Sequence, residues 1–303
     1  MRDVARREFL AALGALGVTG LYTSGGVRLQ ADGADAGQIR PGYAAITWGG
    51  QDEQAIEDIS EAGFKAIQLR ASAFDAFGSR PAALRELLAR RGLTFAVLSS
   101  GNLQIDPGLE RAQIDLHLSH AAFVRDAGGT FLQVIDEKPK DHAPGPDDYT
   151  RLGHLMSELG RRTAAIGVPL VYHHHMNSIG EPPAAIDAIL EATDPAQVGL
   201  LFDIAHYRQA GGDPVAVIRH FGTRIRVVHL KDVRAIDTPP SYQWVELGRG
   251  RVDVRGCVAA LRSIGFDGWA IVELDRVVDA GGSPKASALA NRDYLVNQLG
   301  IPL

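Results

Sequence analysis

The 303-residue chain has a single cysteine, Cys257, so it cannot form a disulfide bond within itself. It also lacks any run of eighteen or more consecutive apolar residues, which excludes a polytopic membrane protein. The 31 Lys and Arg residues and the 36 Asp and Glu residues leave a net charge of −5, which offers no positive surface for duplex nucleic acid or anionic lipid. With 46% hydrophobic residues, the chain is expected to fold around an apolar core and to bind a small molecule rather than nucleic acid.

The first 36 residues have the features of an export signal. Arg6 and Arg7 precede an apolar stretch rich in Ala and Gly, and 34–36 (Ala-Asp-Ala) offers a small-x-small cleavage site. This order resembles a twin-arginine signal, so residues 1–36 are expected to pass through the twin-arginine translocon and to be removed before Gly37. The resemblance implies a periplasmic protein with no membrane attachment after cleavage. An uncleaved amphipathic helix or lipid-facing anchor is the alternative.

The rest of the chain repeats one pattern, in which an amphipathic stretch is followed by a glycine and then by four to seven apolar or β-branched residues. Glycine fits this place because the residue just past a helix often has a left-handed backbone. These glycines are Gly63, Gly92, Gly128, Gly167, Gly222 and Gly265. The eight expected strands are 43–48, 64–69, 93–98, 129–135, 168–172, 198–203, 223–230 and 266–274.

Eight strand–helix units predict a single (β/α)8 TIM barrel, with an open doubly wound sheet as the alternative. Several of the strands are near-continuous hydrophobic runs, which is typical of a parallel sheet covered by helices. No G-x-G-x-x-G follows the first strand, so dinucleotide binding has no support. No linker rich in Pro, Gly or Ser divides the repeats, and residues 37–303 are expected to form one domain. Residues 234–250 are the longest irregular stretch and are expected to form a loop over the barrel mouth.

Polar residues follow the last four strands, at the end of a TIM barrel where chemistry takes place. They are His173, His174, His175, Asp203, His206, His229, Lys231, Glu273 and Asp275. Taken singly, each has a structural explanation, such as a helix cap for Asp203 or a core histidine for His229. Together, the imidazoles and carboxylates predict a site for one divalent metal ion, such as Mn²⁺, Co²⁺, Zn²⁺ or Fe²⁺. The other histidines, at 117, 120, 142, 154 and 220, are expected at the surface.

Three motifs of this region resemble those of the xylose isomerase-like TIM-barrel superfamily of sugar isomerases, epimerases and related lyases. They are D-x-x-H at 203–206, H-L-K-D at 229–232 and E-x-D at 273–275. The stretch VYHHHMNSIGE at 171–181 resembles the corresponding stretch of inosose (keto-inositol) dehydratases. The likeness spans roughly residues 43–298 and implies a metal-dependent enzyme of carbohydrate metabolism.

The resemblance also implies a ligand set for the metal. Members usually bind the ion through a Glu on strand five, an Asp on strand six, a His on strand seven and a Glu on strand eight. The last three correspond to Asp203, His229 and Glu273. Strand five carries His173 where the family's Glu commonly stands, so His173 is the first choice for the fourth ligand, ahead of Glu181 or His175. Mn²⁺ or Co²⁺ is expected, with Zn²⁺ or Fe²⁺ as alternatives.

The reaction implied by the resemblance is removal of a proton next to the carbonyl of a keto-sugar or keto-inositol, because a metal ion stabilises the enediolate that forms. Glu273 or Glu181 is the expected base, and His206 is an acid or a hydroxyl binder. Lys231 would face the developing oxyanion. The His-rich strand five favours β-elimination by a dehydratase or lyase over isomerisation or epimerisation.

The carbohydrate or cyclitol substrate is expected to contact four further residues. Trp48 would stack on the sugar ring, and His175, Arg70 and Arg276 would reach its hydroxyl groups. A non-catalytic periplasmic carbohydrate-binding barrel is the alternative from another class. A metal nuclease of abasic sites, known in one branch of the superfamily, is disfavoured by the acidic balance and the export signal.

Overall fold

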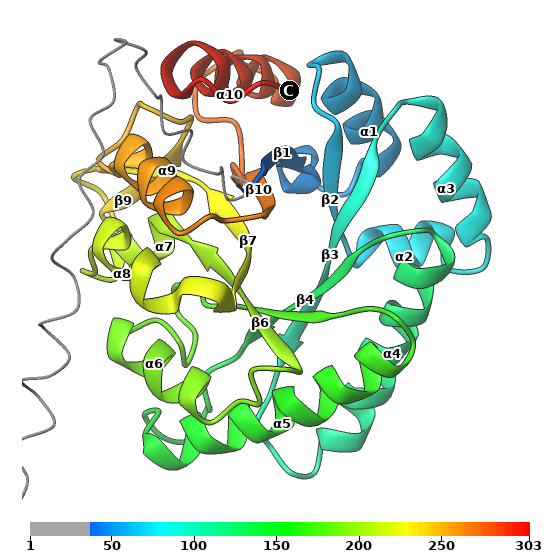
Figure 1. Ribbon diagram of the computed structural model, residues 1–303, viewed down its shortest axis with the longest axis vertical. Coiled ribbons are helices and arrows are strands. Elements are labelled where there is room, and N and C mark those ends of the chain that lie inside the picture. The colour runs from blue at the N-terminus through cyan, green and yellow to red at the C-terminus, as the bar shows by residue number, and fades with distance from the viewer. Residues whose placement is uncertain (1–36) are drawn as a thin grey trace, which may run out of the picture. The chain divides into compact units, whose positions relative to one another are not determined.

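Eight parallel strands close into a barrel in the computed structural model, which describes residues 37–303 (Figure 1). Around the barrel the strands follow the order β1-β10-β7-β6-β5-β4-β3-β2. Their bounds are β1 (Ile39–Ala44), β2 (Ala66–Arg70), β3 (Thr94–Leu103), β4 (Phe131–Asp136), β5 (Leu170–His173), β6 (Val198–Asp203), β7 (Ile225–Leu230) and β10 (Gly268–Val272). The predicted (β/α)8 TIM barrel is confirmed.

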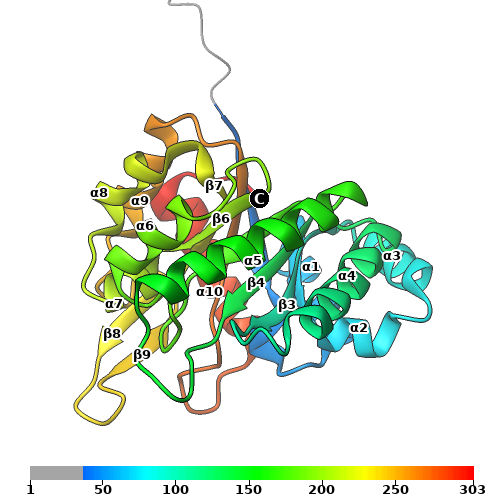
Figure 2. The same ribbon diagram turned by 90° about the horizontal axis from the view of Figure 1, so that it is seen from below.

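Helices lie between the strands and cover the outside of the barrel (Figures 1 and 2). They are α1 (Asp52–Glu61), α2 (Ser72–Phe77), α3 (Pro81–Arg90), α4 (Glu110–Asp126), α5 (Pro146–Ala165), α6 (Pro183–Glu191), α7 (Ile204–Gln209), α8 (Pro214–Phe221), α9 (Val254–Ser263) and α10 (Pro284–Leu299). The glycines predicted to end helices have positive φ angles, as at Gly167 (φ 86°) after α5 and Gly265 (φ 64°) after α9. Within residues 37–303, no helix combines the length and apolar character needed to cross a bilayer. The predicted export signal lies outside the described residues.

Two apolar layers hold the barrel together. The larger one lies between the strands and the outer helices, and the smaller one fills the barrel interior. Side chains of the interior layer come from strands all around the barrel and are almost completely buried; they are Ala44, Ala66, Ala96, Val97, Val171, Leu201, Val227 and Ile271. Because this layer is apolar and closely filled, polar side chains of the barrel interior gather beyond it, at the carboxyl ends of the strands.

The first strand differs from its predicted position. The strand was expected at 43–48, but β1 ends at Ala44 and a 3₁₀ helix, η1 (Ala45–Trp48), follows it. β1 pairs with β10 from Ile39 onward, so the register is set by residues that precede the apolar run. Trp48 consequently lies in the core, 5% exposed, and its Nε1 donates to Asp58 Oδ2 at 2.8 Å.

The expected loop at 234–250 contains a hairpin instead of being wholly irregular. β8 (Asp232–Ala235) and β9 (Tyr242–Val245) pair antiparallel and extend beyond the end of the barrel (Figure 2). The buried Asp232 carboxylate accepts hydrogen bonds from the backbone of Val233, Gly248, Gly250 and Val252. These bonds fix the return of the chain from the hairpin to α9.

His117 and His120 are buried, which corrects the prediction that they lie at the surface. Both project from α4 toward the hydroxyl of Ser100 on β3, whose Oγ lies 2.6 Å from His117 Nδ1 and 2.8 Å from His120 Nδ1. A hydroxyl can donate to one imidazole and accept from the other, so one serine serves the Nδ1 atoms of both rings, while His117 Nε2 is buried without a partner. Three other histidines are exposed as predicted, at 142, 154 and 220.

This buried pair predicts a decline of stability in mild acid. Burial lowers the pKa of His117 to about 4 and also lowers the pKa of His120. Between about pH 6.5 and pH 4 the unfolded chain therefore binds more protons than the folded chain. The free energy of unfolding falls as the pH drops through this range. We expect His117→Gln to flatten this decline by up to about 1.4 kcal/mol per pH unit, measured by urea unfolding between pH 4.5 and 7.5. An unchanged slope in the variant would show that His117 is not the group responsible.

Candidate metal centre

The four side chains predicted as metal ligands converge at the carboxyl end of the barrel. His173 ends β5, Asp203 ends β6, His229 lies on β7 and Glu273 follows β10, and these four strands are consecutive around the barrel. The pairing register places Asp203 directly beside His229. Asp203 and His229 are completely buried, His173 is 2% exposed and Glu273 is 7% exposed, so all four are almost inaccessible to water.

Asp203 uses its two carboxylate oxygens differently. Oδ1 caps α7 by accepting the backbone N–H groups of Ala205 and His206, both at 2.8 Å. Oδ2 is buried without a hydrogen-bond partner and lies 3.4 Å from His229 Nδ1. The helix-cap role and the ligand role foreseen for this residue are therefore compatible, because each needs only one oxygen.

Two imidazole nitrogens in the same place are also without partners. His173 Nδ1 and His229 Nδ1 are buried and unbonded, and His229 Nδ1 lies 3.5 Å from Glu273 Oε2. Leaving a buried polar atom unpaired costs about 1–3 kcal/mol. Within residues 37–303 seven buried side-chain atoms lack a hydrogen-bond partner, and three of them belong to this cluster. A bound cation would give these three atoms the partner that they lack.

The side chains of the site also carry a surplus of negative charge. Burial raises the pKa of the Asp203 and Glu273 carboxyls, but the nearby charge of Lys231 helps to outweigh burial, and each pKa lies below its ordinary value. Asp203, Glu273 and Asp275 thus bring three negative charges, and Lys231 brings one positive charge. Burial lowers the pKa of His173 well below its ordinary value, which keeps that ring neutral. The remaining two negative charges match one divalent ion, so the residues fit the predicted metal.

Lys231 organises the carboxylates although it is completely buried. Its Nζ donates to Glu273 Oε1 at 2.9 Å and to Asp275 Oδ1 at 2.6 Å, and it lies 4.6 Å from the centre of the Trp244 ring. Burial lowers the pKa of Lys231, but the two carboxylates outweigh burial and raise it, so the ammonium stays charged. By binding Oε1, Lys231 leaves Glu273 Oε2 directed toward His229.

The groupings whose donor atoms lie closest together contain His206 and do not include His229. The donor atoms of His173, Asp203, His206 and Glu273 lie within 4.8 Å of one another. However, His206 Nδ1 accepts the backbone N–H of Met176 at 3.2 Å, so the proton of its neutral ring sits on Nε2, 3.7 Å from Asp203 Oδ2. His206 is therefore placed as a hydrogen donor rather than as a ligand.

Residues 175–181 form the rim of the site after β5. The His175 ring lies 4.0 Å from the His206 ring, and its Nδ1 donates to the Met176 carbonyl at 2.7 Å, which leaves Nε2 as an acceptor. Glu181 is not brought to the metal position. Its Oε2 accepts from Lys138 Nζ at 2.8 Å and from the Asn177 backbone at 2.9 Å, so this carboxylate is used to hold the loop.

A cavity of about 230 Å³ lies above the cluster and shows which predicted substrate contacts are in place. Its lining includes Gln68, Arg70, Ser99, Gln133, His175 and Asp275, together with His173 and Glu273. Arg70 and His175 are thus in position. Arg276 is exposed and does not line this cavity, and Trp48 is committed to the core, so the expected stacking of Trp48 on a sugar ring is corrected.

The sequence analysis missed the polar residues on the opposite wall, Gln68 on β2, Ser99 on β3 and Gln133 on β4. The available signal was a single amide inside an otherwise apolar strand, as in the AIQL and FLQV stretches. Both glutamines are buried, 2% and 1% exposed. Buried amides need partners, so each of them indicates a polar neighbour that the strand itself does not supply.

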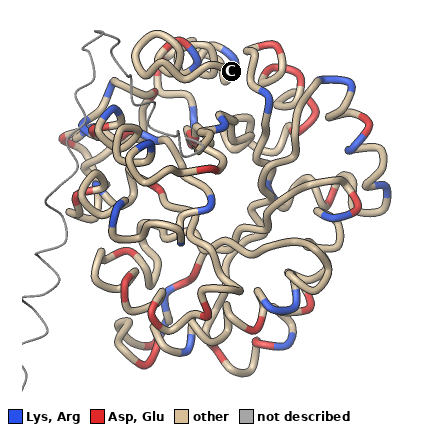
Figure 3. Tube along the Cα trace, viewed as in Figure 1, with Lys and Arg blue, Asp and Glu red and all other residues tan. Residues whose placement is uncertain are grey.

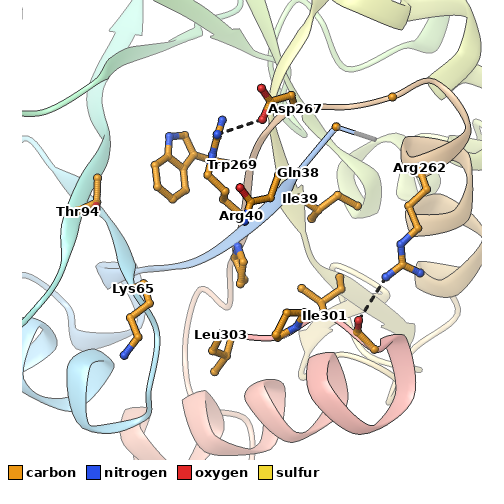
Figure 4. A pocket seen from close by; sticks show the side chains of 15 residues that line it. Gln38, Ile39, Arg40, Lys65, Thr94, Arg262, Asp267, Trp269, Ile301 and Leu303 are labelled. Carbon is orange, nitrogen blue, oxygen red and sulfur yellow. Dashed lines mark hydrogen bonds and ion pairs between the residues drawn. The ribbon is translucent and has the colours of Figure 1, made fainter. Parts of the chain in front are cut away.

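A larger hollow of about 910 Å³ lies at the other end of the barrel, where the strands begin (Figure 4). Arg40 binds Asp267 at 3.0 Å beside Trp269, and Arg262 donates to the Leu299 carbonyl. Among residues 37–303, the groups of potential metal ligands include no residue that lines this hollow. Lys, Arg, Asp and Glu are interspersed along the outer helices (Figure 3), in agreement with the balanced composition.

Comparison with known proteins agrees with this architecture. A family model described as "Xylose isomerase-like TIM barrel" matches residues 56–297. The chain is 27% identical over 299 residues to inosose dehydratase of Lacticaseibacillus casei, covering 87% of this chain and 98% of that protein. It is also 27% identical over 268 residues to the rhizopine catabolism protein MocC of Rhizobium meliloti, covering 76% and 80%.

Among solved structures, the chain resembles the IolI protein with a bound zinc atom. The TM-score is 0.74 at 16% identity, with 86% of this chain and 98% of that chain covered. This similarity concerns the fold. Since the family match spans most of the sequence and the barrel is closed as the family requires, this protein belongs to the xylose isomerase-like TIM barrel family.

Proposed function

We propose that the protein is a metal-dependent lyase that dehydrates a keto-inositol or a related keto-sugar. The observation that carries the proposal is that Asp203 Oδ2, His173 Nδ1 and His229 Nδ1 are all buried and unpaired at the end of the barrel where Glu273 lies. Similarity to inosose dehydratases over nearly their whole length supports the substrate class.

The ligand set would be His173, Asp203, His229 and Glu273. A divalent ion bound there would supply Lewis acidity that stabilises negative charge on a carbonyl oxygen. Two imidazoles and two carboxylates suit Mn²⁺, Co²⁺, Zn²⁺ or Fe²⁺, and we infer Mn²⁺ or Co²⁺ first.

Glu273 is the proposed base for the proton next to the carbonyl. It lines the cavity, and Lys231 holds its Oε1 at 2.9 Å, which fixes the carboxylate. The role of base proposed for Glu181 has no support in the geometry, because Lys138 and Asn177 occupy its Oε2.

Departure of the β-oxygen needs a proton donor, and His206 is the proposed donor. Its Nε2 lies 3.5 Å from Lys231 Nζ, and the charged Lys231 favours negative charge on a nearby oxygen. His175, whose ring is tilted by 43° to that of His206, offers an acceptor nitrogen that can bind a substrate hydroxyl, and Arg70 can bind another.

The size of the cavity supports a small substrate. At about 230 Å³ it is below the roughly 300–1,000 Å³ of pockets for drug-sized ligands. One cyclitol or monosaccharide ring is the expected occupant rather than an oligosaccharide.

An isomerase or epimerase is the second candidate, and one observation favours it. Epimerisation at a carbon needs proton-exchanging groups on two sides of the substrate, and both Glu273 and His175 line the cavity. The two functions differ in their products, because only the lyase releases water.

Metal retention provides a first prediction. Asp203→Asn keeps an oxygen that can cap α7 but removes the negative charge from Oδ2, so the purified variant should lose at least nine-tenths of the metal found in the wild type, measured by inductively coupled plasma mass spectrometry. Asp213→Asn is the matched control, because Asp213 caps α8 through the same type of bonds, away from the site. Equal metal content in Asp203→Asn and wild type would exclude Asp203 as a ligand.

The reaction provides a second prediction. Metal-loaded protein incubated with an inosose should release one water per substrate, detected by mass spectrometry. His206→Gln should lower kcat by roughly 10²–10⁴ with little change in KM, because the proton donor acts in the transition state. Hydrogen exchange from deuterated water without loss of water would indicate the isomerase or epimerase, whereas tight binding without exchange would indicate a non-catalytic barrel.

Location in the periplasm by twin-arginine export stays part of the proposal and rests on the sequence of residues 1–36. Replacing both Arg6 and Arg7 with Lys should retain the full-length chain in the cytoplasm, as seen by cell fractionation and mass determination. Processing near Gly37 in the double variant as in the wild type would contradict this route.

A further inference from the structure

A line of three polar side chains runs from His229 across the interior of the barrel. His229 Nε2 lies 2.9 Å from Gln68 Oε1, Gln68 Nε2 donates to Gln133 Oε1 at 3.1 Å, and Gln133 Nε2 donates to Ser99 Oγ at 3.3 Å. The line starts on β7 and reaches β2, which is not its neighbour in the barrel, and then β4 and β3. The first two bonds join strands that are not neighbours, and the last joins Gln133 to its register partner Ser99 on the adjacent strand.

The orientation of the two amides gives the line a direction, because an amide oxygen only accepts hydrogen bonds and an amide nitrogen only donates them. Gln68 donates through its nitrogen to Gln133, so its oxygen faces His229. When the His229 ring carries one proton, this contact favours the proton on Nε2. This leaves a lone pair on Nδ1, which lies 3.4 Å from Asp203 Oδ2 and 3.5 Å from Glu273 Oε2.

A lone pair that faces two carboxylate oxygens is unfavourable unless a cation lies between them. With the opposite tautomer, Nδ1–H would donate to Asp203 or Glu273 and satisfy the carboxylates without metal. The tautomer of His229 therefore determines whether Nδ1 can bind a cation or instead donates a hydrogen bond to a carboxylate. Gln68 contacts Nε2, the other nitrogen of the ring.

We propose that Gln68 is a positioning residue that sets the Nε2–H tautomer of His229 and thereby opens Nδ1 to the metal, with Gln133 and Ser99 fixing the orientation of the Gln68 amide. The inference rests on the proposed metal-dependent function. It also explains why Gln68 and Gln133, which are 2% and 1% exposed, stand between apolar residues of β2 and β4. A carbonyl-type acceptor behind a metal-binding histidine raises its basicity and fixes its ring.

The test compares zinc affinity of the full-length protein and three variants, measured by competition with a chelating dye. Gln68→Leu removes the acceptor at similar size and should weaken Zn²⁺ binding roughly 10- to 100-fold. Gln68→Glu keeps an acceptor, and the Gln133 amide can turn to donate to it, so affinity should stay close to that of the wild type. Gln104→Leu is the matched control, since Gln104 is bonded to Glu137 outside the cluster, and it should leave affinity unchanged.

A second measurement separates the tautomer from simple packing. In ¹⁵N NMR spectra of the metal-free proteins, His229 should carry its proton on Nε2 in the wild type and in Gln68→Glu, and on Nδ1 in Gln68→Leu. The resonance is assigned by its loss in His229→Gln. A merely structural role of Gln68 would lower the melting temperature without moving the proton.

The outcomes are distinguishable. Wild-type binding of Zn²⁺, with unchanged affinity and tautomer in Gln68→Leu, would overturn the role of Gln68 and leave the metal site standing. Absence of Zn²⁺ binding by the wild type would overturn the metal-dependent function and this inference with it. If Gln68→Leu does not fold, Gln133→Leu serves instead: it frees the Gln68 amide to turn, and the inference requires a mixture of tautomers and weaker binding.

Discussion

The unpaired Oδ2 of Asp203 is the atom on which the account of this protein depends. Its partner oxygen is held by the first turn of α7, so the carboxylate cannot rotate to satisfy itself. Burial excludes water, and the imidazole nitrogen 3.4 Å away, His229 Nδ1, is also unpaired. Three carboxylates and one lysine leave two negative charges, and a divalent cation is the simplest group that neutralises them and completes the unpaired atoms.

The closed barrel brings these side chains together at one end. Consecutive strands β5, β6, β7 and β10 end at the same level, and the apolar layer of small and branched residues beneath them fills the interior. The inward side chains at the strand ends therefore all lie above this layer, at the mouth of the barrel. The second half of the barrel provides ligands, and the first half, through Gln68, Ser99 and Gln133, provides the opposite wall and the bonds that orient His229.

Much of the fold follows from local features of the sequence. Glycines at helix ends and apolar runs predicted the barrel because each helix–strand unit is specified within about thirty residues. The grouping of Asp203, His229 and Glu273 was predictable because strand alternation places all three on the inner face. The start of β1 was not predictable, since its register depends on pairing with β10 at the far end of the chain.

Contacts between distant residues account for the other differences. Gln68 and His229 are 161 residues apart, and nothing in either strand indicates the other. His117 and His120 look like surface residues on an amphipathic helix until Ser100 is placed opposite them. Glu181 and Trp48 carry suitable chemistry, but each is bonded to a partner that directs it away from the metal position, Lys138 and Asp58 respectively.

The most direct test is a crystal structure of protein soaked with Mn²⁺ or Zn²⁺, with anomalous scattering recorded at the absorption edge of the metal. The account predicts one anomalous peak about 2.0–2.2 Å from atoms of His173, Asp203, His229 and Glu273, with His229 bound through Nδ1. A peak held by His173, His175 and His206 would contradict the ligand set. No peak at the barrel mouth would contradict the metal-dependent function.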